Sequence, residues 1–190
     1  MTAIVALLLL LGASPPVQPP PIHGIWETAC LPIGENGRHG VVTRVTLTHR
    51  RLQAVSQVYE TRACDVPTFK LHFRGTLLPV QVDGGRWLLR HHVRAITLTP
   101  QAAAVVAQYN RADSPSSGCG MKGWKLGVAR SVAGRRCAPI DFAPLGTLLY
   151  DAAWTDGEEL RFGAFPEAWS NRSAGQRPTR PLPQSFRRVR

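Results

Sequence analysis

The sequence predicts a mainly all-β fold, an antiparallel β-barrel of about eight strands with one short helix, stapled by disulfides. Segments of alternating apolar and polar residues recur along the chain, turn residues separate them, and the number of cysteines is even. Closing such strands into a barrel removes exposed sheet edges. A length of 190 residues favours one domain with a sizeable core.

The chain opens with an apolar run from Ala3 to Leu11, followed by small residues. The run is too short to cross a bilayer as a helix, but it suits the apolar region of a signal peptide. We therefore expect a signal peptide at 1–14, cut between Gly12 and Gln18, and a secreted or periplasmic protein. A proline-rich spacer at 15–21 then precedes a barrel domain at 22–171 and an arginine-rich segment at 172–190.

The cysteines are Cys30, Cys64, Cys119 and Cys137, with no Cys-x-x-Cys and no zinc-finger spacing. In an exported chain this even number predicts two disulfides. Three pairings are open; we favour Cys30 with Cys64 and Cys119 with Cys137, because each pair flanks a compact run. Four free thiols in a cytosolic protein are the alternative, and we expect no metal site.

The first strands come from three segments. Val41, Thr43, Val45 and Leu47 share one face of a strand, and its antiparallel partner runs from Leu52 to Tyr59 after a turn at 49–51. Residues 69–77 then alternate most clearly, with Phe69, Leu71 and Phe73 on one face.

A hairpin turn at Val82-Asp83-Gly84-Gly85 leads into a long extended segment from Trp87 to Thr99. Its apolar face switches near Ala95, so a bulge or bend is expected there.

Thr99 as N-cap and Pro100 at the first helical position predict a helix through Ala102–Ala107 that ends near Asn110. A helix this short is not stable alone, so we expect it to pack against the sheet. A short strand is expected over Trp124–Val128, followed by a hairpin of 146–154 and 160–165. Residues 185–189 are expected to return to the sheet as a closing edge strand.

Lys and Arg outnumber Asp and Glu by 23 to 12, which gives a formal net charge of +11, and most of the cations are arginine. This charge favours anionic partners such as lipid headgroups or envelope polymers. An arginine-rich surface without a specific partner is the alternative. No basic helix with interleaved aromatic residues occurs, so we expect no specific nucleic-acid partner.

Catalytic patterns are weak. No nucleophile-elbow, zinc-protease, P-loop or dinucleotide-binding fingerprint is present. His91 and His92 point to opposite faces of a strand, so only one of them can face a cavity, and the six histidines are interpreted as surface residues. Asp151 and the Glu158-Glu159 pair form no carboxylate pair that the sequence can place. We therefore expect a protein that is not an enzyme and that has no cofactor.

Gly24-Ile25-Trp26 is similar to the Gly-x-Trp of the lipocalin family. That resemblance implies that Trp26 plugs the closed end of a lipocalin-like barrel, with Gly24 beside it and an arginine of the last strand lying across it. Arg187 or Arg188 is expected in that role, and we choose Arg187.

A wider pattern adds Cys30, Tyr59 with Cys64, the alternating strand 68–75, Leu160-Arg161-Phe162-Gly163 and Arg177-Pro178-Thr179. Over 22–190 it resembles the adenomatosis-polyposis-coli-down-regulated family. Animal members of that family are secreted or membrane-anchored Wnt antagonists whose lipocalin-like barrels hold a lipid. This chain resembles a single-module, bacterial-type relative with fewer cysteines and no membrane anchor. The resemblance implies a lipid-sized cavity.

The expected function is therefore an extracytoplasmic, monomeric binding protein for a lipid or small hydrophobic ligand. Side chains expected to contact the ligand are Tyr59, Phe69, Leu71, Phe73, Trp87 and Tyr150. A filled core is the alternative for these positions, because an eight-stranded barrel has an interior only just large enough for side chains or one small ligand. The alternative function is a structural or adhesion protein of the cell envelope that binds anionic surfaces through the arginine-rich tail.

Overall fold

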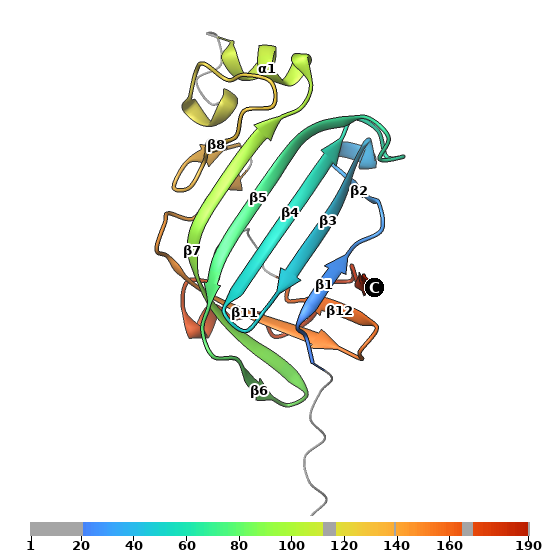
Figure 1. Ribbon diagram of the computed structural model, residues 1–190, viewed down its shortest axis with the longest axis vertical. Helices are drawn as coiled ribbons and strands as arrows, with labels where there is room; N and C mark the ends of the chain where they lie inside the picture. Colours follow the sequence, from blue (N-terminus) through green and yellow to red (C-terminus); the bar gives the residue numbers. More distant parts are fainter. Residues whose placement is uncertain (1–20, 112–116, 139, 165–168, 190) are drawn as a thin grey trace, which may run out of the picture.

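The computed structural model describes residues 21–111, 117–138, 140–164 and 169–189, which form a closed antiparallel barrel of eight strands (Figure 1). The predicted signal peptide, 1–14, and residues 15–20 of the spacer lie outside the described residues. In ring order the barrel strands are β1 (Gly24–Glu27), β3 (His39–Leu47), β4 (Arg51–Tyr59), β5 (Pro67–Leu77), β7 (Arg86–Pro100), β11 (Leu148–Thr155), β12 (Glu159–Phe162) and β13 (Phe186–Arg188).

β13 pairs with β1, so the C-terminal segment supplies the closing strand. The other elements are β2 (Leu31–Ile33), η1 (Glu35–Gly37), β6 (Gln81–Asp83), α1 (Ala103–Asn110), η2 (Ser117–Gly120), β8 (Arg130–Ser131), β9 (Arg136–Cys137), β10 (Ile140–Asp141) and η3 (Ala174–Gln176).

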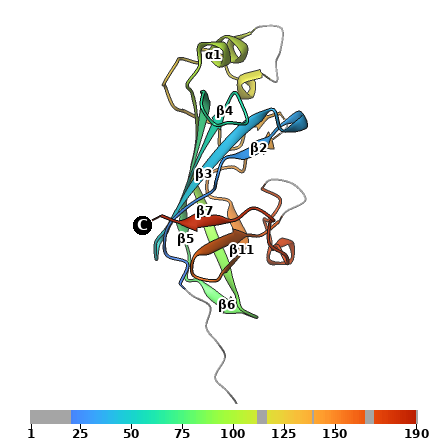
Figure 2. The same cartoon turned by 90° about the vertical axis from the view of Figure 1, so that its right-hand side faces the viewer.

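The ring is closed over only part of its height. β1 pairs with β3 over Arg44–Leu47, and β11 pairs with β7 over 87–92. Farther along, the long wall of β3, β4, β5 and β7 ends in β2 on one side and β8 on the other. Among the described residues no strand pairing joins β2 to β8. Figure 2 shows the short strands β11, β12 and β13 facing one half of the long wall.

The alternation predicted for the long strands is confirmed. Val45 and Leu47 of β3 are buried, as are Phe73 and Leu77 of β5, and all lie on inward positions. In β7 the register shifts between Arg74 and Gly75 of the neighbouring strand, so Arg94 is the extra residue of a bulge. The bulge expected near Ala95 is therefore present, and it keeps the inward face of β7 apolar across the switch in parity.

Both predicted hairpin turns are present. Asp83 pairs with Arg86 across Gly84 and Gly85, whose φ angles of 54° and 78° suit a tight two-residue turn. β11 and β12 are joined through Asp156 and Gly157.

The closed end of the barrel is built around Trp26, which is completely buried. Its indole Nε1 donates a hydrogen bond to the Ile22 carbonyl at 2.8 Å. The Arg188 guanidinium lies over the indole, 4.1 Å from the ring centroid, and donates to the carbonyls of Gly157, His23 and Pro21.

Gly24 explains how the arginine reaches the plug. Its φ is +138°, and a Cβ there would lie 2.7 Å from Nη1 of Arg188. A side chain would therefore displace the guanidinium as well as strain the backbone.

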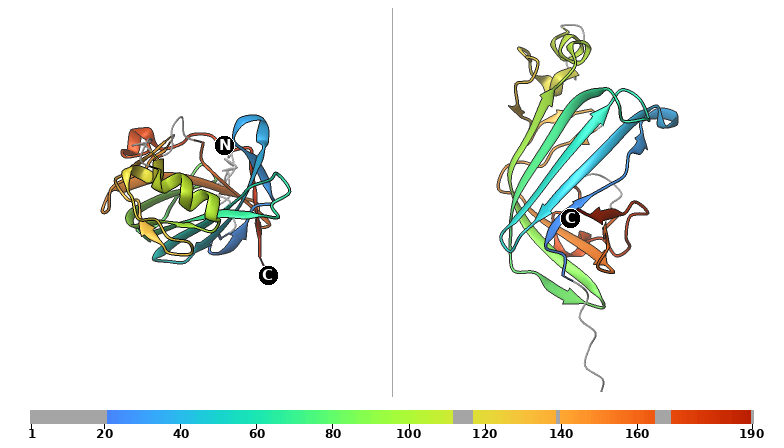
Figure 3. Two further views of the ribbon diagram at one scale, coloured as in Figure 1. Left: turned by 90° about the horizontal axis from the view of Figure 1, so that it is seen from above. Right: turned by 45° about the vertical axis from the view of Figure 1, so that its right-hand side comes forward.

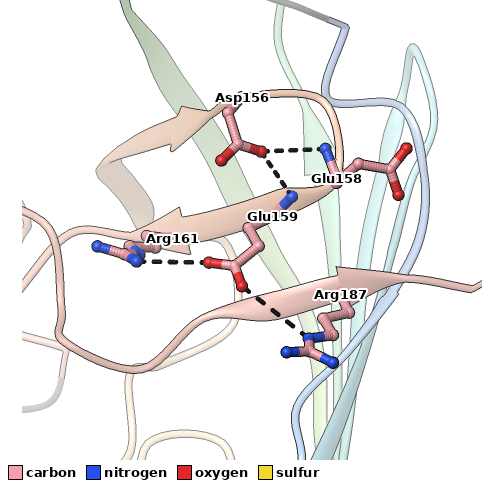
Figure 4. A network of polar contacts seen from close by, with 5 residues as sticks. All are labelled: Asp156, Glu158, Glu159, Arg161 and Arg187. Carbon is pink, nitrogen blue, oxygen red and sulfur yellow. Dashed lines mark hydrogen bonds and ion pairs between the residues drawn. The ribbon is translucent and has the colours of Figure 1, made fainter.

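The arginine over Trp26 is Arg188, so the choice of Arg187 was wrong. Arg187 pairs with Glu27 and Glu159 on neighbouring strands, and its side chain is 84% exposed. Figure 4 shows it directed toward Glu159, which also contacts Arg161. Adjacent residues of a strand point to opposite faces, so only one of the two arginines can reach the plug.

Two disulfides join Cys30 to Cys64 and Cys119 to Cys137, as predicted. They indicate an oxidising, extracytoplasmic environment. The first links the segment after β1 to the β4–β5 loop and crosses Gly40 of β3. A Cβ at Gly40 would lie 2.5 Å from the Cys64 sulfur, so this strand position requires glycine.

The predicted helix start was wrong. α1 begins at Ala103 with Ala102 as N-cap, while Thr99 and Pro100 still belong to β7 and pair with Lys70 and Phe69. Pairing with β5 outweighs the local capping signal, because each paired residue gains ladder contacts.

The expected packing of the helix on the sheet was also wrong. α1 has no buried residue and lies beyond the end of β7, at the top of Figure 1, mainly against η2.

The strand expected over Trp124–Val128 is absent, and the short strand β8 follows it instead. Gly123 and Gly127 have φ angles of 76° and 72°, which interrupt extended backbone. Trp124 is buried beneath α1, and its backbone exchanges two hydrogen bonds with the side-chain amide of Asn110. The Trp124 amide donates to Oδ1 of Asn110 at 2.8 Å, and Nδ2 of Asn110 donates to the Trp124 carbonyl at 2.9 Å.

Candidate ligand cavity

A cavity of about 350 Å³ lies inside the barrel between the Trp26 plug and the unclosed part of the ring. Strands β3, β4, β5, β7 and β11 supply most of its wall. Non-strand residues also contribute, because Phe142 and Trp169 lie on its border. The Trp169 ring lies 5.5 Å from Phe73 and 6.0 Å from Phe142, so three aromatic rings meet on one side of the cavity.

The cavity is mostly apolar. Its lining residues are Thr43, Val45, Leu52, Ala54, Ser56, Leu71, Phe73, His91, Ile140, Phe142, Leu149, Asp151, Phe162, Gly163, Trp169, Asn171, Leu182 and Phe186. Its volume falls at the small end of the range for ligand pockets, roughly 300–1,000 Å³.

One polar group on the wall is the buried, hydrogen-bonded pair of His91 and Asp151. Nε2 of His91 lies 2.9 Å from Oδ2 of Asp151, and their side chains are 4% and 13% exposed. The strands place them together because β7 and β11 are adjacent, with Leu149 opposite His91. The second atoms, Nδ1 of His91 and Oδ1 of Asp151, are buried and have no hydrogen-bond partner within the described chain.

The position of His91 depends on Gly75. A Cβ at Gly75 would lie 3.2 Å from Nδ1 of His91 and 3.1 Å from the Phe73 ring. The glycine therefore makes room for the imidazole, which packs edge-on against Phe73 with the ring centroids 5.5 Å apart.

A second polar group consists of two hydroxyls on the opposite wall. Oγ1 of Thr43 and Oγ of Ser56 lie 2.9 Å apart on the paired strands β3 and β4. One proton serves this mutual bond, so the other hydroxyl keeps a proton that can be donated to a ligand. Asn171 also borders the cavity, but its amide is used to donate to the Tyr150 carbonyl at 2.9 Å.

Of the six residues predicted to contact a ligand, two line the cavity, Leu71 and Phe73. Phe69 and Trp87 pack against the core outside it. Tyr59 and Tyr150 occupy strand positions of the opposite parity to the lining residues, so neither borders the cavity.

Tyr150 instead faces the outside of the barrel, where the Arg177 guanidinium lies 5.5 Å from its ring centroid. Burial lowers the pKa of Arg177, and the neighbouring Arg90 and Arg86 lower it further. This tail arginine is therefore part of the barrel's packing.

His91, Asp151 and Trp169 were missed as cavity residues. The interpretation of all six histidines as surface residues was wrong for His91, which is buried. The shared parity of His91 and Val93 was a signal for an inward position, but nothing in the sequence pairs His91 with Asp151. Trp169 lies in a non-strand segment with φ of 66°, for which alternation gives no direction.

Within the described residues, no three His, Cys, Asp or Glu side chains lie close enough to share a metal ion. The same part of the chain contains no helix that is long and apolar enough to cross a membrane. No protein-family model matches the chain, and no curated protein matches it. The site must therefore be interpreted from its own geometry.

Proposed function

We propose that this protein is an extracytoplasmic binding protein that holds a small, mainly apolar ligand, such as a lipid chain, inside its barrel. The observation that carries the proposal is the apolar cavity of about 350 Å³. Tight packing is the rule in protein interiors, and a cavity of this size is a candidate binding site.

The polar groups suggest what kind of ligand fits. The spare hydroxyl proton of the Thr43–Ser56 pair provides one hydrogen-bond donor on a mostly apolar surface, opposite the His91–Asp151 pair. We therefore favour an apolar ligand with one acceptor group. Entry is expected between β2 and β8, where the ring is not closed by strands among the described residues.

The His91–Asp151 pair adds polar character to the cavity wall. Nε2 of His91 and Oδ2 of Asp151 bond to each other, whereas Nδ1 of His91 and Oδ1 of Asp151 are buried and have no hydrogen-bond partner within the described chain. The likeness to the adenomatosis-polyposis-coli-down-regulated family remains part of this proposal, through the lipid-sized cavity that it implies.

The alternative role, adhesion through the arginine-rich tail, has less support. Arg188 lies over Trp26, Arg177 over Tyr150, and Arg172 donates to the Trp169 carbonyl. These internal contacts engage three of the six arginines of residues 172–190, which leaves fewer of them, among them the exposed Arg187, for an anionic surface.

The test compares two neighbouring residues of β4. Ala54 lines the cavity, whereas Val55 points out of the barrel. We would titrate the wild type, Ala54→Phe and Val55→Phe with the neutral fluorescent probe N-phenylnaphthylamine. Native mass spectrometry before and after organic extraction would identify any ligand that co-purifies.

Ala54→Phe fills the cavity, so its probe affinity is expected to fall by about tenfold or more. Val55→Phe adds the same ring on the other face and is expected to bind as the wild type does. Unchanged affinity in a folded Ala54→Phe variant, or equal losses in both variants, would overturn the proposal. Ala54→Leu, a smaller addition, serves if Ala54→Phe does not fold.

A further inference from the structure

We propose that the end of the molecule formed by α1, η2 and the 121–130 loop is a docking surface for anionic lipid bilayers. We call this end the tip. It lies beyond β7 at the top of Figure 1, away from β1 and the Trp26 plug. Figure 3 shows from above that α1 lies over one side of the ring. The proposal does not depend on a ligand in the cavity.

The first observation is a set of apolar side chains that the fold leaves uncovered. Leu126 is 58% exposed and Val128 is 47% exposed. The helix beside them, Ala103–Asn110, contains no charged residue and buries none of its residues. Exposed apolar groups that gather at one place mark interaction sites.

The second observation is that the loop is held in place. The Val128 amide donates to the Lys125 carbonyl at 3.2 Å, and Gly127 has φ of 72°. This is the pattern of a type II turn with Leu126 at its first central position. The Gly127 amide also donates to the Pro100 carbonyl at 2.8 Å, which anchors the turn to the end of β7.

Contacts below the turn strengthen this anchor. Trp124 is buried, its Nε1 donates to the Gly118 carbonyl at 3.0 Å, and the Cys119–Cys137 disulfide joins η2 to β9. Leu126 is therefore presented at the apex of a fixed turn, where its exposure contributes nothing to folding.

The third observation is charge. The 121–130 loop carries Lys122, Lys125 and Arg130, and in the sequence from 101 to 138 Asp113 is the only acidic residue. Lys122 donates to the Arg111 carbonyl and Arg130 lies over the Trp124 ring, 5.0 Å from its centroid, so neither is paired with a carboxylate in these contacts. The β4–β5 loop, which holds Glu60 and Asp65, projects on the far side from β8 in Figure 1.

Cations beside exposed apolar groups fit one surface in particular. Anionic headgroups attract the cations, and the acyl boundary accepts the apolar side chains. A polyanion such as nucleic acid would use the charges but would give Leu126 and Val128 no apolar environment. Placing the tip on a bilayer would also bring the unclosed part of the barrel toward the membrane.

The test is sedimentation of the mature chain with vesicles of phosphatidylcholine alone or with phosphatidylglycerol added. We expect binding to the anionic vesicles that weakens as salt increases. The affinity of the double variant Leu126→Ser/Val128→Ser for anionic vesicles is expected to fall by about tenfold or more, and that of Lys125→Glu by about fivefold.

Two controls match these variants. Leu145→Ser removes a side chain that is 60% exposed elsewhere, and Arg187→Glu reverses an exposed charge on the tail. Both are expected to bind as the wild type does. No binding of the wild type to anionic vesicles would overturn the proposal. So would a loss in Arg187→Glu as large as in Lys125→Glu, which would assign binding to the tail. Thermal unfolding of every variant establishes that it is folded.

Discussion

Replacing Arg188 by alanine is expected to open the closed end of the barrel. The guanidinium donates to two half-buried carbonyls, of His23 at 2.9 Å and Gly157 at 3.1 Å, and covers the Trp26 ring. Each of these bonds contributes about 1 kcal/mol, and the cation–π contact adds about 1 kcal/mol. The bond to the exposed Pro21 carbonyl adds little, because water replaces it. The sum is about 3 kcal/mol.

The assay is urea unfolding followed by circular dichroism, together with thermal unfolding. For a chain of this size, about 3 kcal/mol lowers Tm by roughly 6–12 °C. Arg188→Lys keeps the charge but not the fork of donors, so an intermediate loss is expected. Arg187→Ala removes only an exposed ion pair of 3.9 Å and is expected to change little. Equal effects of Arg187→Ala and Arg188→Ala would refute the assignment of the plug.

Three further perturbations test other parts of the structure. Gly40→Ala is expected to cost about 2 kcal/mol through a clash with the first disulfide, and a wild-type urea midpoint would contradict this. Asp151→Ala leaves His91 buried without its partner and is expected to lower unfolding free energy by about 1–3 kcal/mol; an unchanged value would argue against the pair. Burial, and then the neighbouring cations Arg74 and Lys70, lower the pKa of His72 below 6.5 in the folded protein. As pH falls, His72 is therefore protonated in the unfolded chain before it is protonated in the folded one. Stability should therefore fall as pH falls from about 7.5 to 5.5, and this slope should decrease in His72→Gln; an unchanged slope in the variant would contradict the role of His72.

The strands were predictable because a half-buried strand repeats every two residues. Residues 69–77 alternate without interruption, and the switch of face near Ala95 correctly predicted a bulge. The helix start was not predictable from local residues. Thr99 and Pro100 form a good capping sequence, but pairing with β5 holds both in extended backbone.

The plug was predictable to within one residue. Gly24 and Trp26 follow a short motif, but Arg187 and Arg188 are chemically identical neighbours on a strand of three residues. Such a strand has too few residues for its inward face to show as alternation. Only its pairing with β1, which sets Arg188 opposite Trp26, decides which arginine faces the indole.

The cavity depends on information of a different kind. His91 and Asp151 are 60 residues apart, and their contact requires both the adjacency of β7 and β11 and their register. A slip of one residue in that pairing would turn Asp151 out of the barrel and replace it with Tyr150 or Ala152. Strand alternation predicts which residues share a face, whereas the register decides which of them meet. The wall of this cavity is therefore a property of the ring closure, and variants that shift the β7–β11 register should alter the site more than substitutions of single lining residues.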